Sequence, residues 1–231
     1  MVENNKNIHS LTEMETLLKK DVLNKGGNIT ISISDIPKIS HTRDIIGNCI
    51  QEWLPQWFED NGLNLEANTA TQKFPDFIAH FDNDKEKSKA VDIKCWNYQQ
   101  SPSFDIANFD SFYNVVYDNP AKIFAKYLTI GYTPTQHGFR IDYVNLLNLW
   151  DIVGKASKYP LSLQVKRGRP YAIRPINFAK CPEKAFKNPL ALIQAVKDAR
   201  LIFPSDTASY DPDDWYNKVK ETVDEQNEKA E

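Results

Sequence analysis

The sequence lacks the features that would place the chain in a membrane or in an oxidising compartment. Its longest apolar runs are only a few residues, far below the roughly 20 that a membrane-spanning helix needs. The first ten residues, MVENNKNIHS, contain no apolar stretch typical of a signal peptide. The three cysteines form no CxxC pair, which argues against a disulfide framework or a structural zinc site. We therefore expect a cytoplasmic protein that has no contact with a membrane.

Several common catalytic and nucleotide-binding motifs are missing as well. The eight glycines form neither GxGxxG nor GxxxxGK[ST], so dinucleotide and P-loop binding have no support. The four histidines show no HxH or HExxH spacing, which makes structural roles the better explanation for them. There is no GxSxG nucleophile elbow, and no cysteine has an obvious catalytic partner. Covalent catalysis therefore has no candidate nucleophile.

Core-forming residues, in contrast, are plentiful: 41% of the 231 residues are hydrophobic and 12% are aromatic. That is enough for one domain with a substantial core. An apolar stripe at helical spacing over residues 45–58 predicts a helix, which Pro55 should kink or divide. Strands are expected at 77–81, 90–96, 123–132, 139–144, 161–165 and 171–176. Helices that flank a run of strands with hairpin-type links predict a single α/β domain with a mixed central sheet.

The net charge of −3 conceals an uneven distribution of charge. Residues 161–200 contain nine basic and two acidic side chains, whereas residues 202–231 contain three basic and nine acidic ones. A basic segment of this kind is either a nucleic-acid footprint or a solvated face balanced by an acidic tail. The acidic tail either shields the basic segment or carries a helix that packs through the apolar stripe of Trp215, Tyr216, Val219 and Val223.

The most informative pattern is Phe74-Pro75-Asp76, followed by Asp92-Ile93-Lys94. Side chains alternate along a strand, so Asp92 and Lys94 share one face, and the neighbouring hairpin strand begins at Asp76. Two converging carboxylates require a cation, and hard oxygen ligands suit magnesium. With a lysine beside them, they could hydrolyse a phosphodiester by activating water and stabilising charge on phosphorus. The alternative is that Asp76 caps a turn, while Asp92 and Lys94 lie on a solvated strand face.

These residues resemble a known family. PDF…VDIK is similar to the active-site signature of the PD-(D/E)XK nucleases, and most closely to that of the EcoRV-like type II restriction endonucleases. The resemblance runs from about Asp35 to Phe178 and includes, in the family's order, Asp35…Asp44, the Ala125–Tyr132 segment and Leu163-Gln…Tyr171-Ala-Ile173. It implies a restriction-endonuclease-like fold, with residues 1–34 as a possible dimerisation element, 35–178 as the catalytic core, and 179–231 as a DNA-contacting segment followed by an acidic helix.

The resemblance also implies roles for individual residues. Asp76 and Asp92 would bind Mg²⁺, and Lys94 would be the catalytic lysine. An accessory carboxylate from the preceding helix would be Asp44, with Glu52 as the alternative. DNA would be contacted by loops at 70–73 and 177–187. The Lys166–Pro170 turn resembles a minor-groove RGRP hook, although a basic hairpin tip is the commoner explanation. Together with the basic segment, these patterns predict DNA contacts at Gln72, Lys73, Lys166, Arg167, Arg169, Arg174, Asn177 and Lys180.

The function implied is Mg²⁺-dependent cleavage of double-stranded DNA at a short palindromic site by a homodimer, because two-fold protein symmetry matches two-fold DNA symmetry. A cognate DNA methyltransferase would be the partner enzyme in the same system. Two alternatives remain open at this point. One is a structure-directed or repair nuclease of the same superfamily, and the other is a non-catalytic DNA-binding module with this fold. The intact Asp-Asp-Lys set argues against the second alternative.

Overall fold

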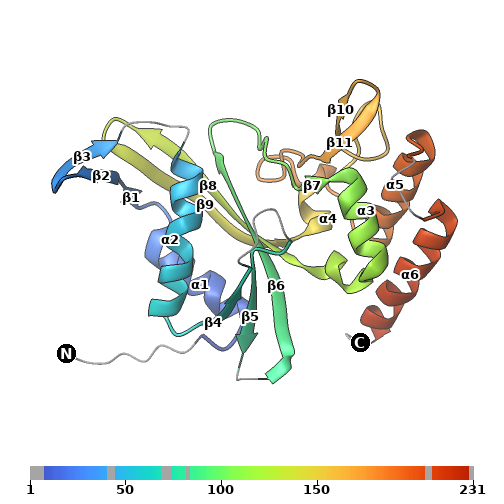
Figure 1. Cartoon of the computed structure of the whole chain (residues 1–231), viewed down its shortest axis with the longest axis horizontal. Coiled ribbons are helices and arrows are strands. Elements are labelled where there is room, and N and C mark those ends of the chain that lie inside the picture. Colours follow the sequence, from blue (N-terminus) through green and yellow to red (C-terminus); the bar gives the residue numbers. More distant parts are fainter. Residues whose placement is uncertain (1–7, 41–44, 69–73, 82–83, 206–209, 229–231) are drawn as a thin grey trace. The chain divides into compact units, whose positions relative to one another are not determined.

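A computed structural model of the chain describes residues 8–40, 45–68, 74–81, 84–205 and 210–228 (Figure 1). The chain divides into two compact units, each assembled from two stretches of sequence. The first unit consists of Met1–Ser101 and Lys126–Leu147, and the second of Pro102–Ala125 and Asn148–Glu231. The polypeptide therefore leaves the first unit after Ser101 and returns to it at Lys126.

The first unit is built on a six-stranded sheet with the strand order β1-β9-β8-β6-β5-β4. Its strands are β1 (Gly26–Gly27), β4 (Asn64–Ala67), β5 (Phe77–Phe81), β6 (Asp84–Asn97), β8 (Lys126–Thr135) and β9 (Gly138–Asn148). The helices are α1 (Leu11–Val22) and α2 (Ile46–Asp60), and a separate two-stranded sheet consists of β2 (Ile29–Ile33) and β3 (Ile36–Ser40).

The central sheet is mixed because one neighbour of β6 is antiparallel to it and the other is parallel. It pairs antiparallel with β5, with Phe77 opposite Val91, and parallel with β8, with Asp92 opposite Tyr127. Antiparallel strands are joined by short turns, whereas a parallel pair requires a long crossover. Here the crossover is the Pro102–Ala125 stretch of the second unit.

One face of the central sheet carries the core of the first unit. Alternate side chains of β5, β6 and β8 pack with buried side chains of α1 and α2, as expected for strands whose successive residues face opposite sides. The main buried contributors are Met14, Leu18, Ile50, Leu54, Phe58, Phe77, Val91, Ile93, Leu128 and Ile130. The other face of β6 therefore presents Asp92, Lys94 and Trp96.

The second unit combines a three-stranded sheet, ordered β10-β11-β7, with helices. The elements are β7 (Ala107–Asn108), α3 (Phe109–Asp118), a 3-10 helix at Pro120–Phe124, α4 (Leu149–Ile152), β10 (Leu163–Lys166), β11 (Arg169–Ile173), a 3-10 helix at Pro182–Lys184, α5 (Pro189–Ile202) and α6 (Pro212–Glu228). Trp215, Val219 and Val223 of α6 are buried, and Trp215 stacks on Tyr113.

The predicted mixed sheet flanked by helices is confirmed. So is the interpretation of the acidic tail as a packed helix, through Trp215, Val219 and Val223. Pro55 does not divide the second helix, because α2 runs from Ile46 to Asp60 without interruption. The proposed boundaries at residues 34/35 and 178/179 remain predictions. Within the described residues, no helix is long and apolar enough to cross a bilayer.

Candidate active site

The hairpin of β5 and β6 brings Asp76 next to Asp92. Because Phe77 lies opposite Val91 in this antiparallel pair, the residue before β5 approaches residues 92 and 93 of β6. The Oδ2 atom of Asp76 accepts a hydrogen bond of 2.6 Å from the backbone N–H of Ile93. Strand β5 begins at Phe77, so its backbone pairing with β6 stops before Asp76. Beyond this point, the Ile93 N–H donates to the Asp76 carboxylate instead. The predicted hairpin and the convergence of the two acidic residues are therefore present.

Lys94 lies beside Asp92 on the same face of β6. Its Nζ is 2.9 Å from Asp92 Oδ2, and the two side chains are 19% and 6% exposed. The positive charge of Lys94 and its hydrogen bond both lower the pKa of Asp92. The Asp92 carboxylate is therefore buried beside a cationic neighbour.

Burial makes the Asp92 carboxylate difficult to ionise. It raises the pKa of Asp92 to about 6; the positive charge of Lys94 lowers this pKa, and the negative charge of Asp76 raises it. The pKa of Tyr127, which lies opposite Asp92 in β8, is also raised, by burial first and then by the charges of Asp92 and Asp76. A second cation at this position would stabilise the charged form of Asp92.

The donor set suits a hard divalent cation. Carboxylate oxygens are the ligands that Mg²⁺ prefers, and such ions are usually held by one or two carboxylates together with waters and substrate phosphates. Asp76 and Asp92 supply this pair, and the Asp92 carboxylate is buried beside Lys94. Within the described part of the chain, no group of three or more His, Cys, Asp or Glu side chains is arranged to hold a metal ion. Asp44, the predicted accessory carboxylate, lies outside the described residues.

Gln51 of α2 contacts this site, although no sequence motif indicates it. Its Nε2 donates a 2.8 Å hydrogen bond to the backbone oxygen of Ile93. The N–H and C=O of Ile93, the residue between Asp92 and Lys94, are therefore bonded to Asp76 and Gln51, respectively. Glu52, the predicted alternative to Asp44, is exposed on α2. The helical period places Glu52 about 100° around the axis from Gln51, so the apolar face of α2 could have indicated which of the two residues faces β6.

The thiol of Cys95, the residue after Lys94, offers no nucleophile. Burial raises the pKa of Cys95 to about 12, with a smaller opposing effect from Lys94. Reactive cysteines have lowered pKa values, because the thiolate is the nucleophile. The candidate site therefore consists of the carboxylates and the lysine.

The predicted basic turn is the tip of the β10–β11 hairpin in the second unit. Arg167 and Gly168 have φ values of 52° and 76°, as a two-residue turn with the twist of a hairpin requires. Lys166, Arg167 and Arg169 are exposed at this tip. The Nζ of Lys166 lies 3.6 Å from the centre of the Tyr171 ring. The hairpin thus presents three cationic side chains to solvent.

The remaining predicted DNA contacts have different surroundings. Arg174 forms an ion pair of 3.0 Å with Asp105 and donates a hydrogen bond to the backbone oxygen of Ser103, so it also joins two segments of the second unit. The carbonyl of Asn177 accepts a hydrogen bond from the backbone N–H of Lys180, whose side chain is exposed. Gln72 and Lys73 lie outside the described residues.

Comparisons with known proteins match almost the whole chain. The family model of the NgoBV restriction endonuclease matches residues 7–230. The chain is 32% identical over 159 residues to the type II restriction enzyme NlaIV of Neisseria lactamica, a match that covers 68% of this chain and 64% of that enzyme. It is 28% identical over 151 residues to the type II restriction enzyme NgoBV of Neisseria gonorrhoeae, which covers 64% of this chain and 84% of that enzyme.

A solved structure of the NlaIV restriction endonuclease has a TM-score of 0.83 and 25% identity, and the match covers 96% of this chain and 91% of that one. In sequence, the chain spans just under two thirds of the NlaIV enzyme of Neisseria lactamica. The predicted restriction-endonuclease-like fold and the resemblance to type II restriction endonucleases are confirmed. The chain belongs to the NgoBV restriction endonuclease family.

Proposed function

We propose that this chain is a type II restriction endonuclease that hydrolyses phosphodiester bonds of double-stranded DNA within a short palindromic site. The observation that carries the proposal is the convergence of Asp76, Asp92 and Lys94 at one end of the β5–β6 hairpin. The family supports the same activity, because both named relatives are type II restriction enzymes.

Restriction endonucleases generally depend on a divalent metal, and we propose that the metal here is Mg²⁺, held by Asp76 and Asp92. When bound, the ion would polarise the scissile phosphate and lower the pKa of a water molecule. Asp92 is the better placed of the two to respond to the ion, since its carboxylate is buried and has a raised pKa. Divalent binding would keep Asp92 ionised at neutral pH.

Lys94 would stabilise the transition state and orient the attacking water. Its ammonium group is held near the carboxylates by the 2.9 Å ion pair with Asp92. A fixed cation beside a phosphate stabilises the negative charge that grows on phosphorus. Gln51 would act as a positioning residue, because its bond to the Ile93 carbonyl holds the backbone between Asp92 and Lys94.

DNA binding would draw on the basic tip of the β10–β11 hairpin. Lys166, Arg167 and Arg169 are exposed cations, which suit contacts to phosphates that position the duplex without reading its sequence. Gln72, Lys73, Arg174, Asn177 and Lys180 remain proposed DNA contacts, and Asp44 the proposed accessory carboxylate. The protein would act as a homodimer, with a cognate DNA methyltransferase as its partner enzyme.

Digestion of a large unmethylated phage DNA tests this function. The purified protein should give discrete bands with Mg²⁺ and none with EDTA or with Asp92→Asn. The matched control is Glu59→Gln, which changes an exposed carboxylate of α2 in the same way and should leave the bands unchanged. A smear would indicate a structure-directed or non-specific nuclease. DNA binding without any cleavage would indicate a binding module.

A further inference from the structure

Asp76 lies just outside the regular strands that hold the other residues of the candidate active site. Strand β5 begins only at the next residue, Phe77, and Asp76 is exposed. Asp92, in contrast, lies within β6 and is 4% exposed. A metal site works only when its ligands are held close to the productive geometry. Contacts beyond the regular strand pairing therefore have to fix the position of Asp76.

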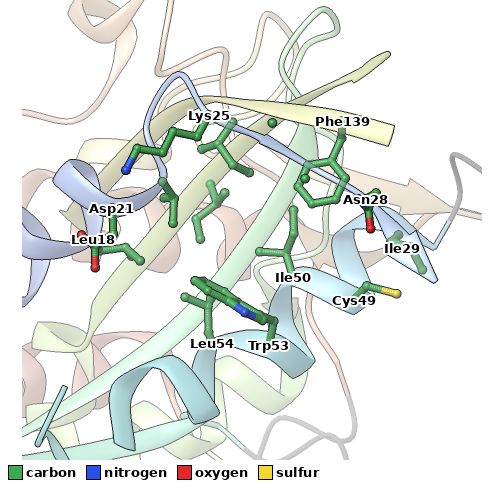
Figure 2. A pocket seen from close by; sticks show the side chains of 15 residues that line it. Leu18, Asp21, Lys25, Asn28, Ile29, Cys49, Ile50, Trp53, Leu54 and Phe139 are labelled. Atoms are coloured by element: carbon green, nitrogen blue, oxygen red, sulfur yellow. The ribbon is translucent and has the colours of Figure 1, made fainter. Parts of the chain in front are cut away.

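The apolar cavity of the first unit does not supply these contacts. It has a volume of about 440 Å³ and is lined by parts of α1, α2 and β9, with Trp53 and Phe139 in its wall (Figure 2). Ile130 of β8 also lines the cavity, and this residue belongs to the core side of the central sheet. Neither Asp76 nor Asp92 contributes to the lining. The position of Asp76 therefore depends on the ends of the strands and not on the walls of this cavity.

Asn68, the residue after β4, donates two hydrogen bonds to the backbone around Asp76. Its backbone N–H donates to the Asp76 carbonyl oxygen at 3.0 Å, and its side-chain Nδ2 donates to the Pro75 carbonyl oxygen at 3.2 Å. The register explains the first bond, because Ala67 lies opposite Phe77 in the antiparallel β4–β5 pair and Asn68 and Asp76 are the next residues along. The second bond requires a short side chain with an amide donor.

Two aromatic contacts fix the ends of the same segment. The rings of Phe74 and Tyr127 pack with their centres 6.1 Å apart, and Phe77 is 3% exposed in the core. These contacts flank Pro75-Asp76 on both sides. The backbone of these two residues is held between them by hydrogen bonds from Asn68. Loss of the Asn68 side chain would therefore free the peptide next to the carboxylate without removing either aromatic anchor.

We propose that Asn68 is a positioning residue of the cleavage reaction, which holds the backbone at Asp76 so that the Asp76 carboxylate stays beside Asp92 before a metal ion binds. The inference rests on the proposed function, in which these two carboxylates share the ion. Asn68 acts through the backbone of the Pro75-Asp76 segment. A displacement of about 1 Å at a reacting group can lower a rate about 100-fold, so the loss of one bond at this point should affect the chemistry more than the fold.

Hydrogen exchange of the Ile93 amide tests the position of the Asp76 carboxylate without DNA or metal. This amide donates the 2.6 Å hydrogen bond to Asp76 Oδ2, so its protection reports how firmly the carboxylate is held. Asn68→Ala removes the bond to the Pro75 carbonyl and should speed Ile93 exchange at least about fivefold, the size expected for the loss of one hydrogen bond. The amides of β8, which lies on the other side of β6 from β5, should keep their wild-type rates.

The matched control is Asn61→Ala at the end of α2. It removes the same kind of bond, from an asparagine side-chain amide to the Trp57 carbonyl oxygen at 2.8 Å, in the same unit. This variant should leave Ile93 exchange unchanged. An unchanged Ile93 rate in Asn68→Ala, or an equal change in both variants, would overturn the proposal. So would faster exchange throughout β8, because it would indicate a loss of stability and not of position.

The Mg²⁺ dependence of DNA cleavage tests the consequence for the reaction. Asn68→Ala should raise the Mg²⁺ concentration for half-maximal rate about fivefold or more, whereas Asn61→Ala should match the wild type. A wild-type Mg²⁺ dependence in Asn68→Ala would overturn the positioning role while leaving the proposed function intact. If the wild type itself cleaves no DNA, the proposed function fails, and Ile93 exchange alone decides whether Asn68 holds Asp76.

Discussion

The two units of this chain contribute different chemistry. The first unit holds a buried carboxylate, Asp92, whose position is set by the register of two strands and whose charge is balanced by Lys94. The second unit presents Lys166, Arg167 and Arg169 in the open, at the tip of a hairpin. Chemistry on a phosphodiester requires groups fixed by packing, whereas phosphate contact requires mainly exposure and charge. We therefore expect cleavage and DNA affinity to respond to different substitutions.

Each unit also contains a hairpin with a turn of two residues at positive φ. In the first unit the turn is Ser34-Asp35 and the strands expose isoleucines; in the second it is Arg167-Gly168 and the tip is cationic. The backbone of the two turns is similar, so the side chains alone distinguish the apolar hairpin from the cationic one. The second hairpin gains a third strand, β7, while the first has no further strand in the described chain.

The largest effect is expected from Asp92→Asn. Loss of this carboxylate should lower the single-turnover cleavage rate by about 1000-fold, because the ion would lose one of its two carboxylate ligands. DNA affinity, measured by fluorescence anisotropy with Ca²⁺ in place of Mg²⁺, should change by less than about fivefold. The Glu59→Gln control should match wild type in both measurements. A rate within tenfold of wild type would remove Asp92 from the active site.

The same substitution should stabilise the metal-free protein above pH 6. Burial raises the pKa of Asp92 from 3.8 to about 6. Between pH 3.8 and about pH 6, the unfolded chain therefore loses the Asp92 proton while the folded chain keeps it. The free energy of unfolding falls as the pH rises through this range. A shift of about 2 units corresponds to about 3 kcal/mol. Urea unfolding in EDTA should therefore show Asp92→Asn to be more stable at pH 8, by up to this amount, and not at pH 4. Equal stabilities at pH 8 would contradict the raised pKa.

Substitution of Gln51 should have an intermediate effect. Gln51→Ala removes the hydrogen bond to the Ile93 carbonyl, and we expect a cleavage rate lower by about 30-fold, roughly 2 kcal/mol. More Mg²⁺ should be needed for half-maximal rate, which a merely structural role would not produce. The matched control is Gln56→Ala on the same helix. The side-chain amide of Gln56 donates a hydrogen bond to Asp60, which is exposed. If both variants behave alike, Gln51 has no positioning role.

The smallest effect is expected in the second unit. Arg167→Ala/Arg169→Ala should weaken DNA binding by about tenfold at low salt and reduce the slope of log affinity against log salt by about 2. The cleavage rate with saturating DNA should stay within about twofold of wild type. Lys218→Ala/Lys220→Ala, on the acidic helix α6, is the control for loss of two positive charges. A lower cleavage rate at saturating DNA would contradict the expectation that these residues affect DNA binding and not catalysis.

Much of the candidate site could be predicted from sequence because it depends on local structure. The Asp76 and Asp92 pair follows from hairpin pairing, and the shared face of Asp92 and Lys94 follows from strand alternation. The packed face of α6 follows from the helical spacing of its apolar residues. These features need only short-range patterns, so composition and spacing were sufficient.

The features that were not predicted depend on long-range contacts. Gln51 and the Ile93 carbonyl are 42 residues apart, and only the packing of α2 on β6 brings them together. Isoleucine alternates along β2, but this alternation shows neither that β3 is its partner among the described strands nor that Ile31 is exposed. The division into two units is also invisible in the sequence, because each unit is assembled from separate stretches.

The local origin of the carboxylate pair has a consequence for folding kinetics. Asp76 and Ile93 are 17 residues apart, and the hairpin that joins them closes a short loop. The parallel pairing of β6 with β8, in contrast, requires the chain to return from the Pro102–Ala125 excursion. Contacts of low sequence separation form earlier, because less chain entropy is lost before they are made. The acidic side chains of the candidate site are therefore expected to meet before the sheet that buries them is complete.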